Sequence, residues 1–283
     1  MIRDAYGDRL KKIKVRVQRQ NAPGEEPFWE NHEIDYEADM NVISVLQKIA
    51  AQSTTAKGEK TTPVAWSGGC LEEVCGSCTM VINGRVRQSC SALVDNLVES
   101  SSDEIVLQPM SKFPVVRDLV VDRGRLFRSL QKVKAWVPVD TYYDMGRGPK
   151  QSRSQQEIAY PLSECMSCGC CVEACPQYTK VELHRLPNES EEEFEQRKLE
   201  AYDTAFLGPN AISQAVLFNS HPTGSNIASE RLDALTEPGG LQVCGNAQNC
   251  VAVCPKEIPL TTSIARAGRA VTVHKIKKIF GAG

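Results

Sequence analysis

The chain has 283 residues, enough for one large or two ordinary domains, and its 41% hydrophobic and 24% charged residues are typical of a soluble globular protein. A formal net charge of -2 argues against general affinity for nucleic acid or membrane, and no apolar run reaches the roughly 20 residues needed to span a bilayer. The N-terminal sequence lacks the apolar core of a secretory signal, so the twelve cysteines indicate metal binding rather than disulfides.

The first third of the chain predicts a small sheet with one helix. Apolar residues, several of them in alternation with polar ones, predict strands at residues 13–17, 34–36, 79–82 and 85–89, and a last strand of the sheet at 105–107. Residues 41–52 have apolar residues at helical spacing, with Asn41 as the candidate N-cap. Asn83-Gly84 suits the type I′ turn of a hairpin. This order of elements fits a β-grasp domain.

Residues from about 111 onward change character. Helical periodicity predicts helices over residues 116–134, 189–207 and 210–219, with an exposed loop at 144–156 and an acidic, solvated helix start at 189–193. No strand signal of comparable strength follows. We therefore expect the α+β class, with a β-grasp domain at 1–114 and a mostly helical domain at 115–283. The basic segment 264–280 either lies on anionic headgroups or on the loops of a membrane anchor, or is a solvated helix or a frayed end.

Four cysteines have the plant-type spacing of a [2Fe–2S] site: Cys70, Cys75, Cys78 and Cys90. Three come from one loop, and the fourth comes from the far side of the predicted hairpin. Gly68, Gly69 and Gly76 would let the backbone approach closely and adopt positive φ. Glu72 and Glu73 in the same loop would lower the potential of a nearby cluster. A zinc site with four cysteine ligands is the alternative, although only one pair has the C-x2-C spacing.

Two later runs each have the outline of the bacterial ferredoxin run, in which the fourth cysteine binds the other cluster. They read Cys165-x2-Cys168-x2-Cys171-x3-Cys175-Pro176 and Cys244-x5-Cys250-x3-Cys254-Pro255. Exchange of the fourth cysteines gives one site four thiolates: Cys165, Cys168, Cys171 and Cys254. It gives the other site only three: Cys175, Cys244 and Cys250. Ala247 stands where the missing thiolate is expected, so the sequence predicts one [4Fe–4S] and one [3Fe–4S] cluster.

Three alternatives to this assignment stay open. Zinc could replace the clusters, although seven cysteines with two Cys-Pro ends suit it poorly. A shifted frame could use Cys170, which we otherwise expect to be a buried thiol that binds no metal. Asn246, Gln248 or Asn249 could supply a fourth ligand, but amides bind iron weakly.

Three redox centres on one chain are typical of an electron carrier, because a long transfer must be divided into short hops. The chain has no G-x-G-x-x-G after a strand and no Ser/His/Asp or paired-carboxylate arrangement. Its four histidines are scattered along the sequence: His32, His184, His221 and His274. We therefore expect no catalytic residue on this chain and a two-electron site, such as a flavin, on a partner.

Three stretches resemble the iron–sulfur subunit of succinate dehydrogenase (succinate:quinone oxidoreductase): GGCLEEVCGSCTMVINGRVRQSC, SECMSCGCCVEACP and LQVCGNAQNCVAVCPKEIPLTTSI. The intervening QPMSKFPVVRDLVVDR, KAWVP and FNSHPTG are similar to the form that has menaquinone-linked, dihaem anchors. The resemblance covers about residues 10–265. The iron–sulfur subunit of fumarate reductase is the close relative.

This resemblance implies a β-grasp [2Fe–2S] domain followed by a helical domain with the other two clusters. It implies a flavoprotein subunit with covalent FAD that oxidises succinate, and a membrane-anchor cytochrome b subunit with haem b. Electrons would pass from FAD through [2Fe–2S], [4Fe–4S] and [3Fe–4S] to quinone, with this chain held at the cytoplasmic face of the membrane. The [2Fe–2S] ligands are those given above, with Cys78 where some members have Asp.

The residues that bind quinone in this family are only partly matched in this chain. Ubiquinone-linked members have a tryptophan shortly after the Cys-Pro and a histidine directly after the first cysteine of the last run. This chain has Gln177, Tyr178, Thr179 and Lys180 at the first place and Gly245 at the second, which favours menaquinone and leaves Pro176 and Lys180 as candidate contacts. A fumarate reductase subunit, a soluble ferredoxin-like carrier for another dehydrogenase and a metal-stabilised scaffold are the alternative functions.

Overall fold

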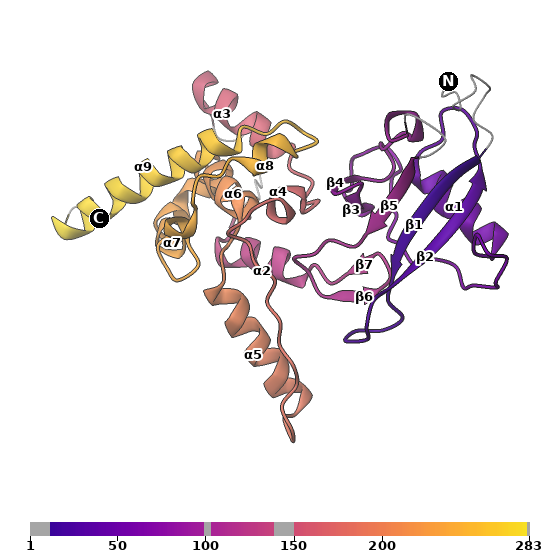
Figure 1. Ribbon diagram of the computed structural model, residues 1–283. Coiled ribbons are helices and arrows are strands. Elements are labelled where there is room, and N and C mark those ends of the chain that lie inside the picture. The colour runs from indigo at the N-terminus through magenta and orange to yellow at the C-terminus, as the bar shows by residue number, and fades with distance from the viewer. Residues whose placement is uncertain (1–11, 99–102, 139–149, 282–283) are drawn as a thin grey trace, which may run out of the picture. The chain divides into compact units, whose positions relative to one another are not determined.

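The computed structural model describes residues 12–98, 103–138 and 150–281. The chain divides into two compact units, Met1–Asp122 and Arg123–Gly283 (Figure 1). This division lies beyond the sequence-based boundary near residue 114, because a short hairpin after that residue is tied to the first unit. The α+β class with a sheet-containing first part and a helical second part is confirmed.

A five-stranded mixed sheet forms the framework of the first unit, in the order β2-β1-β5-β3-β4. Its strands are β1 (Lys12–Arg19), β2 (Phe28–Asp35), β3 (Thr79–Ile82), β4 (Arg85–Gln88) and β5 (Glu104–Gln108). β1 pairs antiparallel with β2 and parallel with β5, while β3 pairs antiparallel with both β4 and β5. All five predicted strands are therefore present.

The helix α1 (Val42–Gln52) packs on this sheet and completes the first core (Figure 1). Asn41 is its N-cap, as predicted, and its side-chain oxygen accepts a hydrogen bond from the Ser44 amide at 3.0 Å. Leu46 and Ile49 of α1 are buried in one cluster with Val15 of β1. Burial of each such side chain contributes about 1.5–3 kcal/mol. A 3-10 turn at Val94–Asn96 lies between β4 and β5.

The predicted helix over residues 116–134 is wrong in its first half. Three shorter elements replace it: β6 (Val115–Arg117), β7 (Val120–Val121) and α2 (Gly124–Lys132). Asp118 has φ 46°, a left-handed conformation that an α-helix does not contain. Its buried carboxylate accepts from Arg19 Nε at 2.8 Å and from the backbone amides of Gln20 at 3.2 Å and Ala65 at 2.8 Å. These tertiary hydrogen bonds override the helical periodicity.

The second unit contains no strand in its described residues, 123–138 and 150–281. Besides α2, its α-helices are α3 (Arg153–Ser163), α4 (Cys170–Glu173), α5 (Glu191–Thr204), α6 (Pro209–Ser220), α7 (Ala228–Ala234), α8 (Asn249–Ala252) and α9 (Leu260–Ile279). Two 3-10 turns lie at Gly224–Ile227 and Leu241–Val243. α6 is central and packs against α3, α7 and α9. Ser263 of α9 donates to Ser213 of α6 at 3.0 Å in the buried contact.

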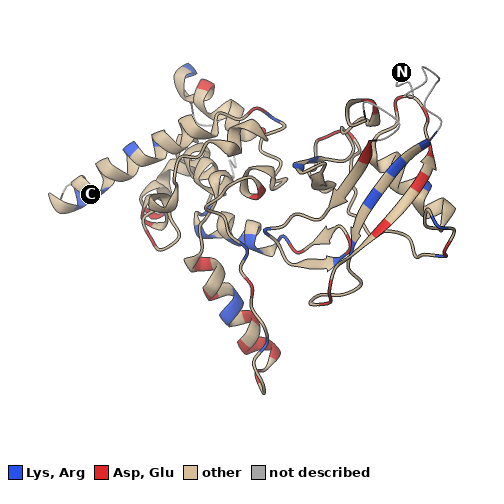
Figure 2. Cartoon of the chain, viewed as in Figure 1, with Lys and Arg blue, Asp and Glu red and all other residues tan. Residues whose placement is uncertain are grey.

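Most of the helices predicted for this unit are present. The segments 189–207, 210–219 and 264–280 correspond to α5, α6 and α9. Ser190 and Glu193 form a capping box at the start of α5, and Figure 2 shows charged residues along this helix. Of the loop expected at 144–156, residues 144–149 lie outside the described residues. The end of that prediction is wrong, because a capping box between Ser152 and Gln155 starts α3 at Arg153.

Within the part of the chain that the structure describes, no helix combines the length and the apolar character that crossing a bilayer requires.

Candidate metal centres

The β3–β4 hairpin brings Cys78 and Cys90 together. Cys78 immediately precedes β3, and its carbonyl accepts hydrogen bonds from the amide and the hydroxyl of Ser89 at 3.2 and 2.9 Å. The two sulfurs lie 3.4 Å apart, close enough to bind one tetrahedral metal ion. Asn41, the N-cap of α1, also donates to the Cys90 carbonyl at 2.9 Å. The sheet and the helix therefore both fix this pair.

The loop before the hairpin wraps its backbone around Cys70. Three amides donate to Cys70 Sγ at 3.3 Å each, those of Glu72, Val74 and Cys75. Leu71 and Glu73 have φ of 61° and 55°, an uncommon conformation for residues with side chains. Alternation of such residues turns successive N–H groups toward one sulfur. Amide donors of this kind stabilise an anionic metal centre.

Glycines near this loop serve two different purposes. Gly76 has φ 68°, and among the three glycines singled out from the sequence it alone has a positive φ. A Cβ at Gly69 would lie 2.8 Å from Cys75 Sγ, and one at Gly68 would lie 2.4 Å from the Trp66 ring. Gly68 and Gly69 therefore allow close packing rather than a left-handed backbone.

Cys75 and Cys90 have opposite environments. Cys75 is exposed, and hydrogen bonds from the hydroxyl and the amide of Ser77 lower the pKa of its thiol to about 6. Cys90 is buried, and burial followed by the neighbouring Cys78 raises its pKa to about 11. The Cys75 thiol is therefore largely deprotonated near neutral pH. The Cys90 thiol loses its proton only when a metal ion binds its sulfur.

The seven cysteines of the two later runs fall into two groups according to the charges they exert on one another. The first group takes three residues from the first run and one from the second: Cys165, Cys168, Cys171 and Cys254. The second group is Cys175, Cys244 and Cys250. Burial is the main cause that raises the pKa of Cys171; the other three members of its group raise it further, and Cys250 of the second group has the smallest effect. Cys254 and Cys175 therefore each lie beside cysteines of the other run.

Two short helices hold the runs against each other. α4 in the first run contacts α8 in the second. Each helix is preceded by a residue with left-handed φ, Gly169 at 91° and Gln248 at 64°. Asn249 Nδ2 donates to the Ala174 carbonyl at 3.1 Å and links the runs directly. The fold thus places side by side two segments that are separated by α5, α6 and α7 in the sequence.

One cavity is lined by all four cysteines of the first group, by Cys170 of α4 and by Asn210 of α6. Asn210 is 2% exposed, and neither polar atom of its amide has a hydrogen-bond partner in the structure. An unpaired buried amide costs about 1–3 kcal/mol, so this side chain suits a cavity that receives an acceptor. The N-terminus of α6 adds partial positive charge at the same place. This donor set fits a [4Fe–4S] cluster.

A buried cation lies beside the first run. Arg125 is 2% exposed, its guanidinium is 3.7 Å from the centroid of the Tyr178 ring, and no carboxylate among the described residues pairs with it. It donates instead to the carbonyls of Thr179 and Phe206. Burial lowers the pKa of Arg125, but a guanidinium keeps its charge in proteins. Arg125 therefore keeps a buried positive charge against the segment that follows Cys175, at Tyr178 and Thr179.

The remaining predicted residues are placed as follows. Cys170 is fully buried in α4, as expected, and it also lines the cavity of the first group, so its lack of a metal stays a prediction. Pro176 and Lys180 are exposed, and Lys180 pairs with Glu182 at 2.9 Å. A Cβ at Gly245 would lie 2.7 Å from Gln177 Nε2, so the Gln177 amide fills the space that the missing side chain leaves.

The four histidines do not converge. His32 pairs with Glu30 at 2.9 Å, His274 pairs with Asp233 at 2.9 Å, and His221 accepts from the Gly224 amide at 3.1 Å. In residues 12–98, 103–138 and 150–281, no three His, Cys, Asp or Glu side chains are close enough to share a single metal ion.

Sequence reasoning missed Asn210, Arg125 and Gln177. Asn210 carries one usable signal, since it is a polar residue in the first turn of a helix and is followed by the apolar Ala211 and Ile212. The contacts of Arg125 and Gln177 are tertiary and leave no mark in the spacing of residues.

Comparisons with known proteins agree with these two units. The family described as "2Fe-2S iron-sulfur cluster binding domain" matches residues 14–128, and the family described as "4Fe-4S dicluster domain" matches residues 160–258. The chain is 48% identical over 271 residues to the succinate dehydrogenase iron-sulfur subunit of Bacillus subtilis (strain 168), a match that covers 96% of this chain and 97% of that one. It is 28% identical over 200 residues to the fumarate reductase iron-sulfur subunit of Wolinella succinogenes, covering 69% and 72%.

A chain of the Mycobacterium smegmatis Sdh1 complex in the apo form has a similar fold, with a TM-score of 0.68 and 20% sequence identity over 94% of this chain and 97% of that one. The two units of the fold and the 48% identity to the Bacillus protein over nearly the whole chain point to the same family. This chain belongs to the family of succinate dehydrogenase iron–sulfur subunits.

Proposed function

We propose that this chain is the electron-transfer subunit of a membrane-bound succinate:quinone oxidoreductase. The observation that carries the proposal is the grouping of Cys254 with the first run and of Cys175 with the second, in a chain 48% identical to a succinate dehydrogenase iron–sulfur subunit. When bound, iron–sulfur clusters accept and release single electrons. The chain's own residues hold and separate these centres and set the charge around them.

The ligand sets follow from the cysteine groups. The [2Fe–2S] ligands are Cys70, Cys75, Cys78 and Cys90; the [4Fe–4S] ligands are Cys165, Cys168, Cys171 and Cys254; the [3Fe–4S] ligands are Cys175, Cys244 and Cys250. Ala247 offers no ligand to the last group. The backbone amides around Cys70 and the side chains of Asn210 and Arg125 offset the negative charge of the thiolates.

The partners that complete the reaction are a flavoprotein with FAD and a membrane-anchor cytochrome b with haem, which holds this chain at the cytoplasmic face of the membrane. Menaquinone is the acceptor. Pro176 and Lys180 are exposed next to Cys175, which supports their role as quinone contacts. The Gln177 amide beside Gly245 adds a polar group at the place where ubiquinone-linked members carry a histidine.

Low-temperature EPR of the complex in its native membranes tests this proposal. A narrow signal close to the free-electron g value in the air-oxidised sample, lost on reduction with succinate, is the expected result for a [3Fe–4S] centre fed by the flavoprotein. Absence of that signal with full iron content would contradict the ligand assignment. Comparison of succinate oxidation with fumarate reduction by the same preparation separates a dehydrogenase from a fumarate reductase.

Ala247→Cys sharpens the same test, because it restores the missing thiolate. We expect the narrow oxidised signal to disappear while the iron content rises. Cys170→Ala tests the shifted frame, since Cys170 lines the cavity of the first group; an unchanged spectrum is the result expected if it binds no metal.

A further inference from the structure

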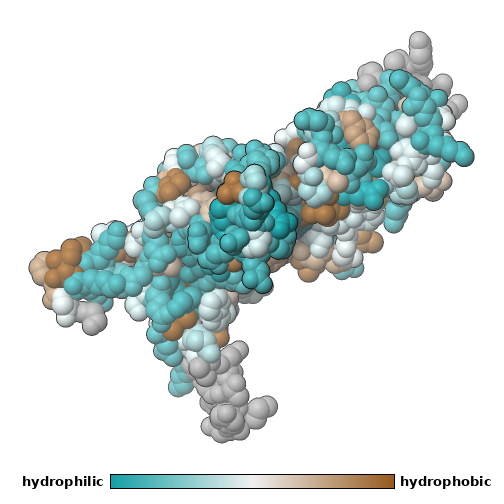
Figure 3. Space-filling view, turned by 90° about the horizontal axis from the view of Figure 1, so that it is seen from below, coloured by the Kyte–Doolittle hydropathy of each residue, from teal (hydrophilic) through white to brown (hydrophobic). Residues whose placement is uncertain are grey.

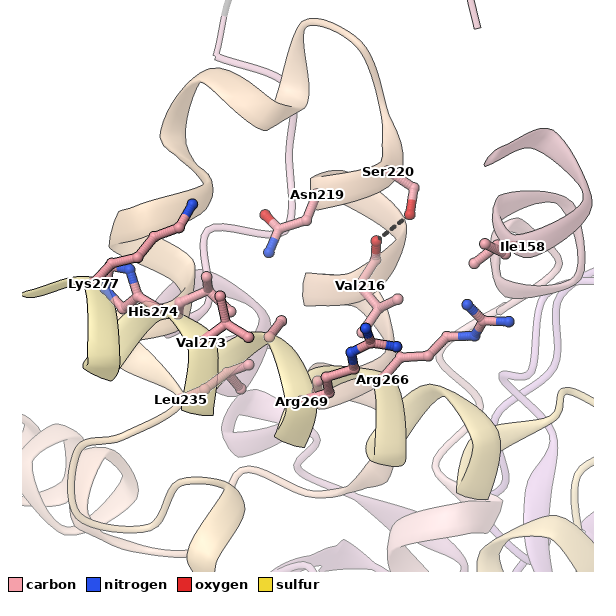
Figure 4. A pocket seen from close by; sticks show the side chains of 13 residues that line it. Ile158, Val216, Asn219, Ser220, Leu235, Arg266, Arg269, Val273, His274 and Lys277 are labelled. Carbon is pink, nitrogen blue, oxygen red and sulfur yellow. Dashed lines mark hydrogen bonds between the residues drawn. The ribbon is translucent and has the colours of Figure 1, made fainter. Parts of the chain in front are cut away.

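A groove lies between α9 and the helices α3, α6 and α7, away from the residues assigned to the clusters (Figure 4). Its volume is about 510 Å³, within the range of about 300–1,000 Å³ that holds small-molecule ligands. The apolar side chains that line it are Ile158, Val216, Leu232, Leu235, Ala267, Ala270 and Val273. The groove is thus an apolar trough between helices.

The α9 side of this groove carries unpaired positive charge. Arg266, Arg269 and Lys277 line it, all three are exposed, and none has an ion pair or hydrogen bond to another described residue (Figure 4). The carboxylate of Asp233 is already occupied by His274 at 2.9 Å and Lys278 at 2.7 Å. The three cations are therefore free to bind an anion from outside the chain.

The apolar character of the groove continues along α9 to the end of the helix. Val273 at the groove is 45% exposed, and farther along α9 Ile276, Ile279 and Phe280 are 49%, 77% and 79% exposed. Figure 3 shows hydrophobic residues gathered at this end of α9, at the left of the view. Exposed apolar residues interleaved with cations are typical of a helix that lies at a lipid–water interface.

We propose that this groove, the α9 groove, binds an anionic phospholipid of the bilayer. One acyl chain lies against the apolar walls, and the phosphate lies at Arg266 and Arg269, whose guanidinium groups can each donate two hydrogen bonds to it. A free phosphate ion would leave the apolar walls exposed to water, whereas a phospholipid satisfies both the walls and the cations. This inference goes beyond the electron-transfer role and holds whichever reaction the clusters serve.

Flotation with lipid vesicles tests the proposal on the full chain loaded with its clusters. The expected result is binding to vesicles of phosphatidylcholine mixed with phosphatidylglycerol and little binding to phosphatidylcholine alone. Replacement of Arg266, Arg269 and Lys277 by Gln should weaken binding by about 100-fold, because each cation near an anionic membrane contributes about 1 kcal/mol. Lys14→Gln, Lys57→Gln and Lys60→Gln together are the charge-matched control in the first unit and should retain most of the binding.

Ala270→Trp separates a lipid held in the groove from charge attraction at the surface. It fills the groove and keeps every cation, so we expect it to weaken binding by about tenfold; Ala270→Phe serves if the Trp variant loses its cluster absorbance. Equal weakening by the two triple variants, or unchanged binding by the groove-filling variant, would overturn the proposal. So would a photo-reactive residue at position 270 that captures an acidic protein segment in the membrane-bound complex instead of lipid.

Discussion

The two units gather their cysteines in opposite ways. In the first unit all four lie between Cys70 and Cys90, on one loop and the hairpin that follows it. In the second unit each group combines residues from two runs that α5, α6 and α7 separate in the sequence. The first arrangement needs only local structure. The second requires the helical fold to be assembled before either group is complete.

The units also offset negative charge differently. Around Cys70 the donors are backbone amides of a largely exposed loop, which any sequence with the right turns supplies. At the first group of the second unit, the buried polar group is the amide of Asn210, and the buried guanidinium of Arg125 lies on Tyr178 in the segment after the first run. A site formed by local segments can use its own backbone, whereas a site formed between helices depends on particular side chains.

Among single substitutions, Cys254→Ala tests most directly whether the second unit shares cysteines between its two runs. We expect loss of the [4Fe–4S] cluster, although Cys254 belongs to the second run, because the residue lies with Cys165, Cys168 and Cys171. The [2Fe–2S] signal in EPR of the reduced protein should remain at full intensity. Loss of the three-cysteine centre with an intact [4Fe–4S] signal would contradict the exchange of cysteines.

Removal of iron with a chelator under reducing conditions should affect the units unequally. We expect amide protection in residues 165–175 and 244–254 to fall to that of an unfolded chain, since metal binding there is coupled to the packing of α4 on α8. Protection in β1 and β5 should remain, because these strands pack in an apolar core. Hydrogen exchange followed by mass spectrometry measures both. Equal loss in the two units would show that the first unit also depends on metal.

A buried ion pair stabilises the first unit. Asp118→Ala leaves Arg19, which is 1% exposed, with Glu30 at 2.7 Å as its remaining carboxylate. It also removes the acceptor of the Gln20 and Ala65 amides, so it should lower the free energy of opening of β1 by about 3 kcal/mol. Exchange of the β1 amides measures this change. Glu33→Ala, which breaks the exposed pair with Lys12 on the same sheet, should cost less than about 1 kcal/mol. A similar effect of the two variants would contradict the role given to Asp118.

Asn210→Leu has the smallest expected effect and tests charge compensation in the second unit. Loss of one N–H donor should lower the midpoint potential of the [4Fe–4S] cluster by about 60 mV, the equivalent of about 1.4 kcal/mol. The apo protein should become more stable, because an unpaired buried amide is removed. A redox titration followed by EPR measures the potential, with Asn226→Leu on the exposed surface as the control. An unchanged potential would mean that the amide does not reach the cluster.

The features that the sequence predicted correctly depend on short-range patterns. Asn41 caps α1 because its side chain reaches an amide three residues away, and Asn83-Gly84 turns the hairpin through its own backbone. The errors lie where distant residues decide. Asp118 is left-handed because Arg19, Gln20 and Ala65 bind its carboxylate, and no periodicity reports such contacts.

The candidate sites follow the same rule. Cysteine spacing led to the three proposed ligand sets, since the geometry of iron–sulfur ligation restricts the intervals between ligands, and these sets stay a prediction. Spacing could not identify Asn210 or Arg125, because their significance comes from burial and from tertiary contacts. The position of Asn210 in the first turn of α6 is the one trace that the sequence carries.

The exchange of cysteines between the two runs is the central claim, and an anomalous-difference map at the iron absorption edge tests it most directly. Crystals of the intact complex, recorded at high resolution, would show which iron atoms Cys254 Sγ binds. The structure predicts that Cys254 binds the same cluster as Cys165, and that Cys175 binds the same cluster as Cys244. A map in which Cys254 shares a metal centre with Cys244 and Cys250 would contradict the account.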